Sequence, residues 1–120
     1  MYSITEQVVT WLSSLGYAAS TYPPSNAPDE FVTVERTGGG VVDMVDHPII
    51  AVQAWASTEA RAEELATAIR NEALTSSKPA GVHRMGVDSG PYPFWDESTG
   101  KPRYQVVFDT TCILTNQTDN

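Results

Sequence analysis

Two stretches of the chain space their apolar side chains as a helix with one buried face does. In the first stretch, residues 3–15, apolar positions recur three or four residues apart, and a helix would gather them on one side. These positions are Ile4, Val8, Trp11, Leu12 and Leu15. Ser3 and Glu6 have the spacing of a capping box, and Gly16 offers a left-handed stop. The pattern predicts an amphipathic helix between these signals.

The second helical stretch runs from about 58 to 74 and is rich in alanine. Ser57 precedes it as the expected N-cap, and Glu59 lies in the first turn, where the helix dipole favours an anion. One stripe of the predicted helix is apolar and consists of Ala62, Leu65, Ala66, Ile69 and Ala73. Because alanine is small, the stripe predicts a helix that approaches a sheet closely.

Apolar runs of strand length fill much of the remaining chain. Residues 31–36 are β-rich, and 49–56 form an almost continuous apolar run, which is typical of a central strand covered on both faces. Residues 103–114 alternate, so a strand would place one set of side chains on a single face. That set is Tyr104, Val106, Phe108, Thr110, Cys112 and Leu114. Shorter candidates are 17–22, 41–45 and 81–87, the last with His83, Met85 and Val87 on one side.

Residues that break regular structure separate these elements. Three prolines mark 23–29 as a loop, Thr37 and three glycines end the strand before them, and three prolines with two glycines predict a long loop over 88–102. The expected order is a helix, two to four strands, a helix and two strands. Strands in runs favour a single α+β domain with a largely antiparallel or mixed sheet packed against two helices. We expect this domain to span 1–115, followed by a polar C-terminal tail at 116–120.

The charge of the chain limits the partners that it can hold tightly. Its 120 residues carry 15 acidic and 7 basic side chains, a formal net charge of −8. Nucleic acids and anionic membranes attract clustered Lys and Arg, so this composition argues against both. No apolar run has the length of a spanning helix, and the first six residues lack the pattern of a signal peptide. The single cysteine, Cys112, excludes an internal disulfide and predicts a reducing compartment.

Few side chains combine in a way that indicates catalysis. Asp43, Asp46 and His47 lie close together in the sequence. With His83 they could form a metal site, but their spacing matches no known metal motif and is typical of a polar turn. Cys112 could act as a nucleophile, although its place on the apolar face of the last strand favours a small buried side chain. We therefore expect no enzyme activity, no catalytic residue, no metal and no cofactor.

Two segments are better candidates for contact surfaces. The glycines at 38–40 lack the spacing of a phosphate-binding loop and predict a tight or mobile turn. Aromatic residues in the predicted loop at 88–102 either cap an open end of the sheet or face a partner, and both interpretations stay open here. The candidate contact residues are Gly38, Gly39, Gly40, Val41, Val42, Asp43 and Met44 in the first segment, and Tyr92, Phe94 and Trp95 in the second.

Four short motifs follow one another along the chain. They are Arg-Thr-Gly-Gly at 36–39, Gln-Ala-Trp-Ala-Ser at 53–57, Ser-Gly-Pro at 89–91 and Pro-Arg-Tyr at 102–104. They accompany a strand that runs into a Gly-rich turn, a strand that feeds an Ala-rich helix, and a Gly-Pro-aromatic loop before the closing strand. Over nearly its whole length the chain thereby resembles the tail terminator, or tail-completion, proteins of bacteriophages with long non-contractile tails and of their prophages.

The resemblance implies a structural function and carries over no catalytic residue. Proteins of this kind form a ring, commonly a hexamer, on the head-proximal end of the tail tube, where they end polymerisation and present a surface to the head. The implied partners are further copies of the chain, the major tail tube protein and a head–tail connector or neck protein, while DNA passes through the lumen without specific binding. The implied location is the head-proximal end of the virion tail, after assembly in the cytoplasm of the bacterial host.

Two other classes remain open at this point. Another phage neck protein, a head-closure protein or a head–tail adaptor, would differ by failing to bind tail tubes in the absence of heads. A small ferredoxin-like ligand-binding domain or enzyme would need a polar constellation in a cleft, which the sequence does not indicate. Under the terminator interpretation, the acidic balance predicts a neutral or negative ring lumen, because like charge keeps DNA from sticking.

Overall fold

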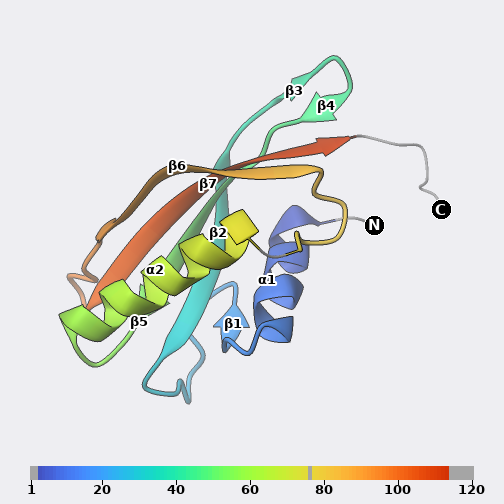
Figure 1. Ribbon diagram of the computed structural model, residues 1–120. Helices are drawn as coiled ribbons and strands as arrows, with labels where there is room; N and C mark the ends of the chain where they lie inside the picture. Colours follow the sequence, from blue (N-terminus) through green and yellow to red (C-terminus); the bar gives the residue numbers. More distant parts are fainter. Residues whose placement is uncertain (1–2, 76, 114–120) are drawn as a thin grey trace.

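In the part of the chain that the structure describes, a mixed sheet of seven strands and two helices make up the fold (Figure 1). The computed structural model describes residues 3–75 and 77–113, so the predicted tail at 116–120 lies outside the described residues. In chain order the elements are α1 (Ile4–Ser14), β1 (Ala19–Ser20), β2 (Phe31–Gly38), β3 (Val41–Val42), β4 (Val45–Asp46), β5 (Ile49–Trp55), α2 (Glu59–Thr75), β6 (Arg84–Pro93) and β7 (Arg103–Ile113). β1 and β2 pair in parallel and the other pairs are antiparallel, which confirms the predicted α+β class.

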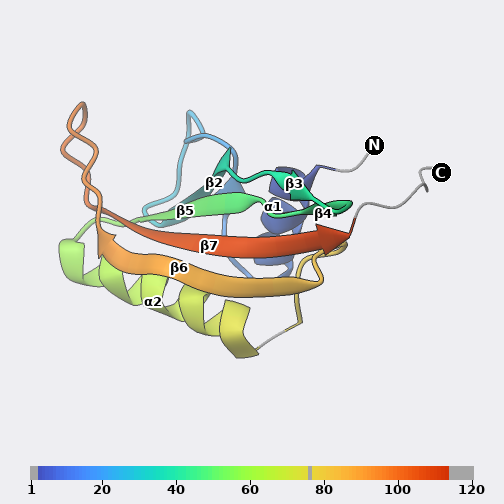
Figure 2. The same cartoon turned by 90° about the horizontal axis from the view of Figure 1, so that it is seen from above.

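The strand order β1-β2-β5-β7-β4-β3, with β6 paired to β7 as well, gives the sheet one long strand. β5 and β4 follow one another along β7, because Ile49 lies opposite Asp109 and Val45 lies opposite Ile113. The β2–β5 hairpin therefore continues past the main sheet as the β3–β4 hairpin (Figures 1 and 2). β7 has 11 residues and spans about 35 Å, so it connects the two ends of the molecule.

α1 begins and ends where its sequence signals predict. The hydroxyl of Ser3 accepts a hydrogen bond from the Glu6 N–H at 3.2 Å, which satisfies one free donor of the first turn. At the other end, Gly16 has a φ of +99°, a conformation that glycine adopts freely and other residues disfavour. Local chemistry therefore bounds this helix.

Replacing Ser3 with alanine is expected to lower the free energy of unfolding by about 1 kcal/mol, because the Glu6 N–H loses its acceptor. Urea denaturation followed by far-UV circular dichroism measures the change. Ser13→Ala is the matched control, since Ser13 is exposed in the same helix and its hydroxyl makes no hydrogen bond within the described residues. An equal loss of stability in the two variants would contradict the capping role of Ser3.

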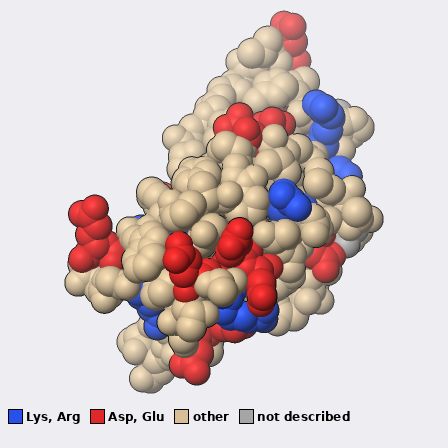
Figure 3. Space-filling view, turned by 60° about the vertical axis from the view of Figure 1, so that its left-hand side comes forward, with Lys and Arg blue, Asp and Glu red and all other residues tan. Residues whose placement is uncertain are grey.

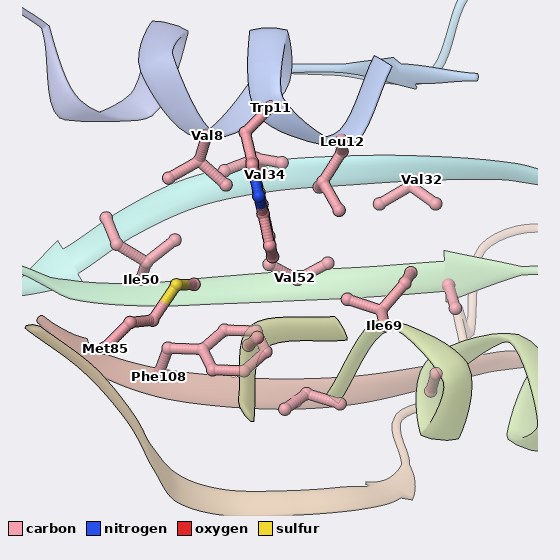
Figure 4. Packing of buried hydrophobic residues seen from close by; sticks show 14 of the residues in the cluster. Val8, Trp11, Leu12, Val32, Val34, Ile50, Val52, Ile69, Met85 and Phe108 are labelled. Atoms are coloured by element: carbon pink, nitrogen blue, oxygen red, sulfur yellow. The ribbon is translucent and has the colours of Figure 1, made fainter. Parts of the chain in front are cut away.

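Both helices pack on the same face of the sheet. From α1, Val8, Trp11 and Leu12 point toward strand residues such as Val34 and Val52 (Figure 4). The predicted stripe of α2 is buried throughout, as the alanine-rich pattern indicates. The same hydrophobic cluster contains Ala62, Leu65, Ala66, Ile69 and Ala73 of α2 and Met85, Val106 and Phe108 of β6 and β7. One core therefore joins both helices to the four long strands.

Thr58, not Ser57, caps α2. The Thr58 hydroxyl accepts from the Arg61 N–H at 3.1 Å, and the Thr58 carbonyl accepts from the Ala62 N–H at 3.0 Å, which are the bonds of an N-cap. The predicted cap was wrong by one residue. Serine and threonine have similar capping preferences, so the point at which the chain leaves β5 decides between them.

The three glycines do not form the turn of the hairpin, and this prediction was wrong. β2 continues to Gly38, the register shifts between Arg36 and Gly38, and the chain reverses only at Asp43 and Met44. The predicted strand at 41–45 is therefore two short strands, and five strands precede α2 instead of two to four. The sequence pointed to the glycines because Asp-Met is an uncommon pair at a hairpin turn.

The predicted loop over 88–102 is also wrong in its first half. β6 runs on to Pro93, so the connection to β7 covers only 94–102. β6 pairs with β7 alone, and an edge strand tolerates prolines because its outer side needs no N–H donor. Register shifts between Val87 and Tyr92 accommodate this irregular sequence. Glycine and proline favour a loop in this segment, but pairing with β7 holds residues 88–93 in a strand.

The faces of the last two strands mostly agree with the predicted alternation. Met85 and Val87 face the core, whereas His83 precedes β6 and is exposed, so the predicted set of three was wrong at its first member. On β7 the predicted set is buried as far as the structure describes it, and Leu114 lies outside the described residues. The buried members are Tyr104, Val106, Phe108, Thr110 and Cys112.

Candidate functional site

The β3–β4 hairpin projects beyond the sheet at one end of the molecule (Figures 1 and 2). It exposes three apolar side chains, with exposed fractions of 56% for Val41, 61% for Val42 and 64% for Met44. Single exposed apolar residues are ordinary, but contiguous ones indicate a contact surface. We call Val41, Val42, Asp43 and Met44 the hairpin tip.

The turn of the hairpin tip has an unfavourable backbone conformation for its residues. Val42 pairs with Val45, so Asp43 and Met44 form a two-residue turn, and their φ angles are 51° and 64°. Positive φ at both positions is the arrangement of a type I′ turn, which favours Asn-Gly or Asp-Gly. Methionine in this left-handed region costs about 1–2 kcal/mol, and Met44 is not buried here in return. Such an outlier motivates a search for a function outside the single chain.

The stem of the hairpin is held firmly. The Arg36 guanidinium donates to both carboxylate oxygens of Asp46, at 2.9 and 3.2 Å, and to the carbonyl of Gly38 at 3.0 Å. A bidentate Arg–carboxylate pair of this kind fixes the relative orientation of the two side chains as well as their distance. Gly39 has a φ of +94°, and its Cα lies against the backbone of His47 and Pro48 in the returning segment of the hairpin. A Cβ at this position would overlap the carbonyl of His47. The hairpin tip is therefore presented in a defined position.

The connection between β6 and β7 lies at the opposite end of the molecule (Figure 2), and it exposes aromatic side chains. Phe94 and Trp95 follow β6 and have exposed fractions of 41% and 47%. Arg103, at the start of β7, donates to the Phe94 carbonyl and accepts from the Phe94 N–H through its own carbonyl. With Lys101 on the same connection, we call Phe94, Trp95, Lys101 and Arg103 the aromatic end.

Cation–π and stacking contacts connect the aromatic end to the sheet. The Arg103 guanidinium carbon lies 4.7 Å from the Trp55 ring centre and 4.5 Å from that of Phe94. Trp55 stacks on Phe31 at 5.0 Å, and the Lys101 ammonium lies 5.6 Å from the Phe31 ring centre. Each such contact contributes about 0.5–2 kcal/mol. Phe94 therefore folds back on the sheet through Arg103, which supports the capping interpretation for this residue.

A compact turn shapes the rest of the connection. The Asp96 carboxylate accepts hydrogen bonds from the Ser98 hydroxyl at 2.9 Å and the Thr99 hydroxyl at 2.7 Å. These donors, first Thr99 and then Ser98, lower the pKa of Asp96 because they favour its charged form. The turn is therefore ordered by its own side chains, and both carboxylate oxygens of Asp96 accept hydrogen bonds within it.

A ladder of polar side chains crosses the face of the sheet opposite the helices. The Thr33 hydroxyl donates to the Gln53 carbonyl oxygen at 2.7 Å, and the Gln53 amide donates to Gln105 at 2.7 Å. The ladder continues from the Gln105 amide to the Tyr92 hydroxyl, and the Trp55 indole N–H donates to Thr33. Thr33, Gln53 and Gln105 are buried, so they depend on one another for hydrogen bonds. The β5 side chains from Ile50 to Trp55 are buried on both faces of the sheet, which agrees with the predicted central strand.

Sequence reasoning missed this ladder. Gln53 is a polar residue inside the apolar run of β5, which was a signal that some partner must satisfy it. The partners themselves come from two other strands, β2 and β7. Only the register of β2, β5 and β7 shows that Thr33, Gln53 and Gln105 stand side by side. The ladder is an internal support and not an exposed binding site.

The structure brings the predicted contact residues together in two groups. Gly38 to Met44 form the stem and the tip of one hairpin, while Phe94 and Trp95 lie at the other end of β7. Tyr92 differs from its two neighbours, because it lies in β6, is half-buried and accepts a hydrogen bond from Gln105. The candidate surfaces are therefore the hairpin tip and the aromatic end, at opposite ends of the molecule.

The other candidate groups are dispersed. Asp46 is paired with Arg36, Asp43 is at the hairpin tip, and Cys112 is buried. Within 3–75 and 77–113, no three His, Cys, Asp or Glu side chains gather as metal ligands would. On the face shown in Figure 3, the basic side chains are separated by acidic and uncharged ones. None of the described helices is long and apolar enough to cross a bilayer.

Comparison with known proteins adds no relative. No protein-family model matches the chain, and no curated protein matches it either. The hairpin tip and the aromatic end therefore remain the candidate surfaces.

Proposed function

We propose that the protein is a structural subunit that forms a ring on the head-proximal end of a bacteriophage tail tube, ends tube polymerisation and offers a docking surface to the head. The observation that carries the proposal is the pair of exposed surfaces at opposite ends of a small domain. Each copy in a closed ring contacts one neighbour on each side through two different surfaces. A domain that binds one small ligand has no such requirement.

The sequence motifs and the charge support the same proposal. The motifs from 36–39 to 102–104 resemble those of tail terminators, and the α+β fold with a projecting hairpin suits a subunit with several neighbours. In the proposed assembly the partners are other copies of the chain in a hexamer, the major tail tube protein and a head–tail connector. The assembly forms in the host cytoplasm and stays in the virion tail. A net charge of −8 keeps DNA from sticking as it passes.

Tail tubes polymerised without heads provide the direct test. The purified protein is expected to bind one end of each tube as a ring in electron micrographs and to stop the tube from lengthening. A chain that stays monomeric and leaves tubes untouched would refute the proposal. Binding to connector complexes without binding to tubes would identify a head-closure protein or a head–tail adaptor instead.

A further inference from the structure

We propose that the hairpin tip of one copy docks on the aromatic end of a second copy, in a head-to-tail contact. The proposal refines the ring described above and rests on that function only for the closure of successive contacts into a ring. It assigns the two exposed surfaces of the chain to each other. Each surface thereby gains an occupant of defined chemistry, a second copy of the same chain.

The positions of the two surfaces favour a head-to-tail contact over a two-fold one. The hairpin tip adjoins the end of β7 at Ile113, and the aromatic end adjoins its start at Arg103. A two-fold contact centred on one end would bury that surface against itself and leave the other exposed, whereas a two-fold dimer that joined both pairs of unlike ends would have to align the two copies side by side over their whole length. A contact between unlike ends buries both on every copy except the terminal ones, and a ring has no terminal copy.

The shapes and chemistry of the two surfaces are complementary. The hairpin tip is a narrow projection that carries Met44, a flexible side chain whose sulfur packs well against the edges of rings. The aromatic end offers the exposed side chains of Phe94 and Trp95, and Arg103 holds Phe94 in place. Aromatic residues with fixed orientation are typical anchors of protein interfaces.

The charges of the two surfaces also complement each other. Among the described residues, the Asp43 carboxylate has no hydrogen bond or ion pair. Lys101 and Arg103 form no salt bridge within the described chain. Both cations lie over aromatic rings, and the Arg103 guanidinium also donates to the Phe94 carbonyl. The same connection carries the acids Asp96 and Glu97, and the Thr99 hydrogen bond and, to a smaller extent, the charge of Arg103 lower the pKa of Asp96. The attraction therefore depends on placing Asp43 over the two cations and not on the net charge of the segment.

A Met44→Gly variant separates a contact role from a role in folding. Glycine suits the positive φ of this position, so the fold should gain stability, while the contact loses its apolar anchor. In sedimentation velocity up to about 1 mM, the wild-type chain should associate and M44G should do so at least about tenfold more weakly. Tyr22→Ser is the matched control, because Tyr22 is an exposed ring outside both surfaces, and it should associate as the wild type does.

Two outcomes of this experiment overturn the proposal. One is a wild-type chain that stays monomeric over the whole concentration range. The other is equal association of the wild type and M44G. Because M44G is expected to fold at least as well as the wild type, a loss of association cannot be a loss of folding.

Disulfide trapping identifies the two surfaces directly. On a Cys112→Ala background, a copy with M44C is mixed with a copy with W95C and oxidised by air. Mixed dimers of M44C with W95C should accumulate, and M44C should not cross-link to itself. Cross-linking of M44C to itself in their place, or equal trapping in the two cases, would show that the contact is not head-to-tail.

Exchanging the charges of Asp43 and Lys101 tests the proposed ion pair between copies. Binding to tail tubes, measured on the same variants, distinguishes a failure of this contact from a failure of the proposed phage function. Asp43→Lys and Lys101→Glu should each weaken association, and the double variant D43K/K101E should restore it. Failure of the double variant to recover would overturn the pairing of these ends. A chain that self-associates as described but ignores tail tubes would refute only the phage function, whereas tube capping that M44G leaves intact would refute only the contact.

Discussion

Gly39→Ala is expected to lower the free energy of unfolding by about 2–5 kcal/mol. A Cβ at this position would overlap the carbonyl oxygen of His47 and lie 2.8 Å from its carbon and 2.9 Å from the Cα of Pro48. These are backbone atoms, which move only if the strands separate. The left-handed φ of +94° adds about 1–2 kcal/mol for any side chain, and overpacking adds about 1–3 kcal/mol.

Gly40→Ala is the matched control for this prediction. It makes the same chemical change one residue later, where φ is not left-handed and no atom lies within 4 Å of the added Cβ. Urea denaturation gives the stability of both variants, and hydrogen exchange of the His47 amide, which donates to the Gly40 carbonyl at 3.0 Å, reports on the hairpin stem. Equal stability of the two variants would contradict the close approach at Gly39.

Gln53→Leu is expected to lower the free energy of unfolding by about 2–4 kcal/mol, although leucine is apolar and the site is buried. Gln53 is only 4% exposed and bridges Thr33 and Gln105. Its loss leaves the Thr33 hydroxyl without an acceptor and the Gln105 oxygen without a donor, and each buried unsatisfied group costs about 1–3 kcal/mol. Gln7→Leu is the matched control and should change stability little, because the Gln7 side chain has no hydrogen bond within the described residues.

A double-mutant cycle decides whether the ladder acts as a unit. If Gln53 and Gln105 satisfy each other, Q53L/Q105L should cost clearly less than the two single variants added together, because neither partner is then left buried alone. Simple additivity in urea denaturation would show that the two glutamines contribute independently. The ladder matters for the candidate site because it runs from β2 to Tyr92, two residues before the aromatic end.

Regular local patterns were sufficient to predict the larger elements. The spacing of Val8, Trp11 and Leu12 depends only on the helical repeat, and Ser3 and Gly16 act through bonds with residues a few positions away. The alternation over β7 likewise reports a strand with one buried face. Each of these signals is contained in a short stretch of chain, so the sequence alone could show it.

Structural features that depend on pairing with a neighbouring strand were predicted less well from the sequence. The hairpin turn at Asp43 and Met44 forms because β3 and β4 pair there, against the preference of its own residues. β6 continues to Pro93 because β7 offers a partner and the outer edge needs no donor. In both places the local sequence favoured a different structure from the one that pairing across the sheet stabilises.

By itself, the sequence determined two amphipathic helices, an alternating final strand, an α+β class and an acidic chain. The tertiary structure alone decided that the hairpin tip and the aromatic end lie at opposite ends of β7, and that Gln53 is satisfied by residues of other strands. The reason is physical: helical and strand periods are properties of consecutive residues. Register, burial of a polar group and the distance between two surfaces arise only when distant segments pack together.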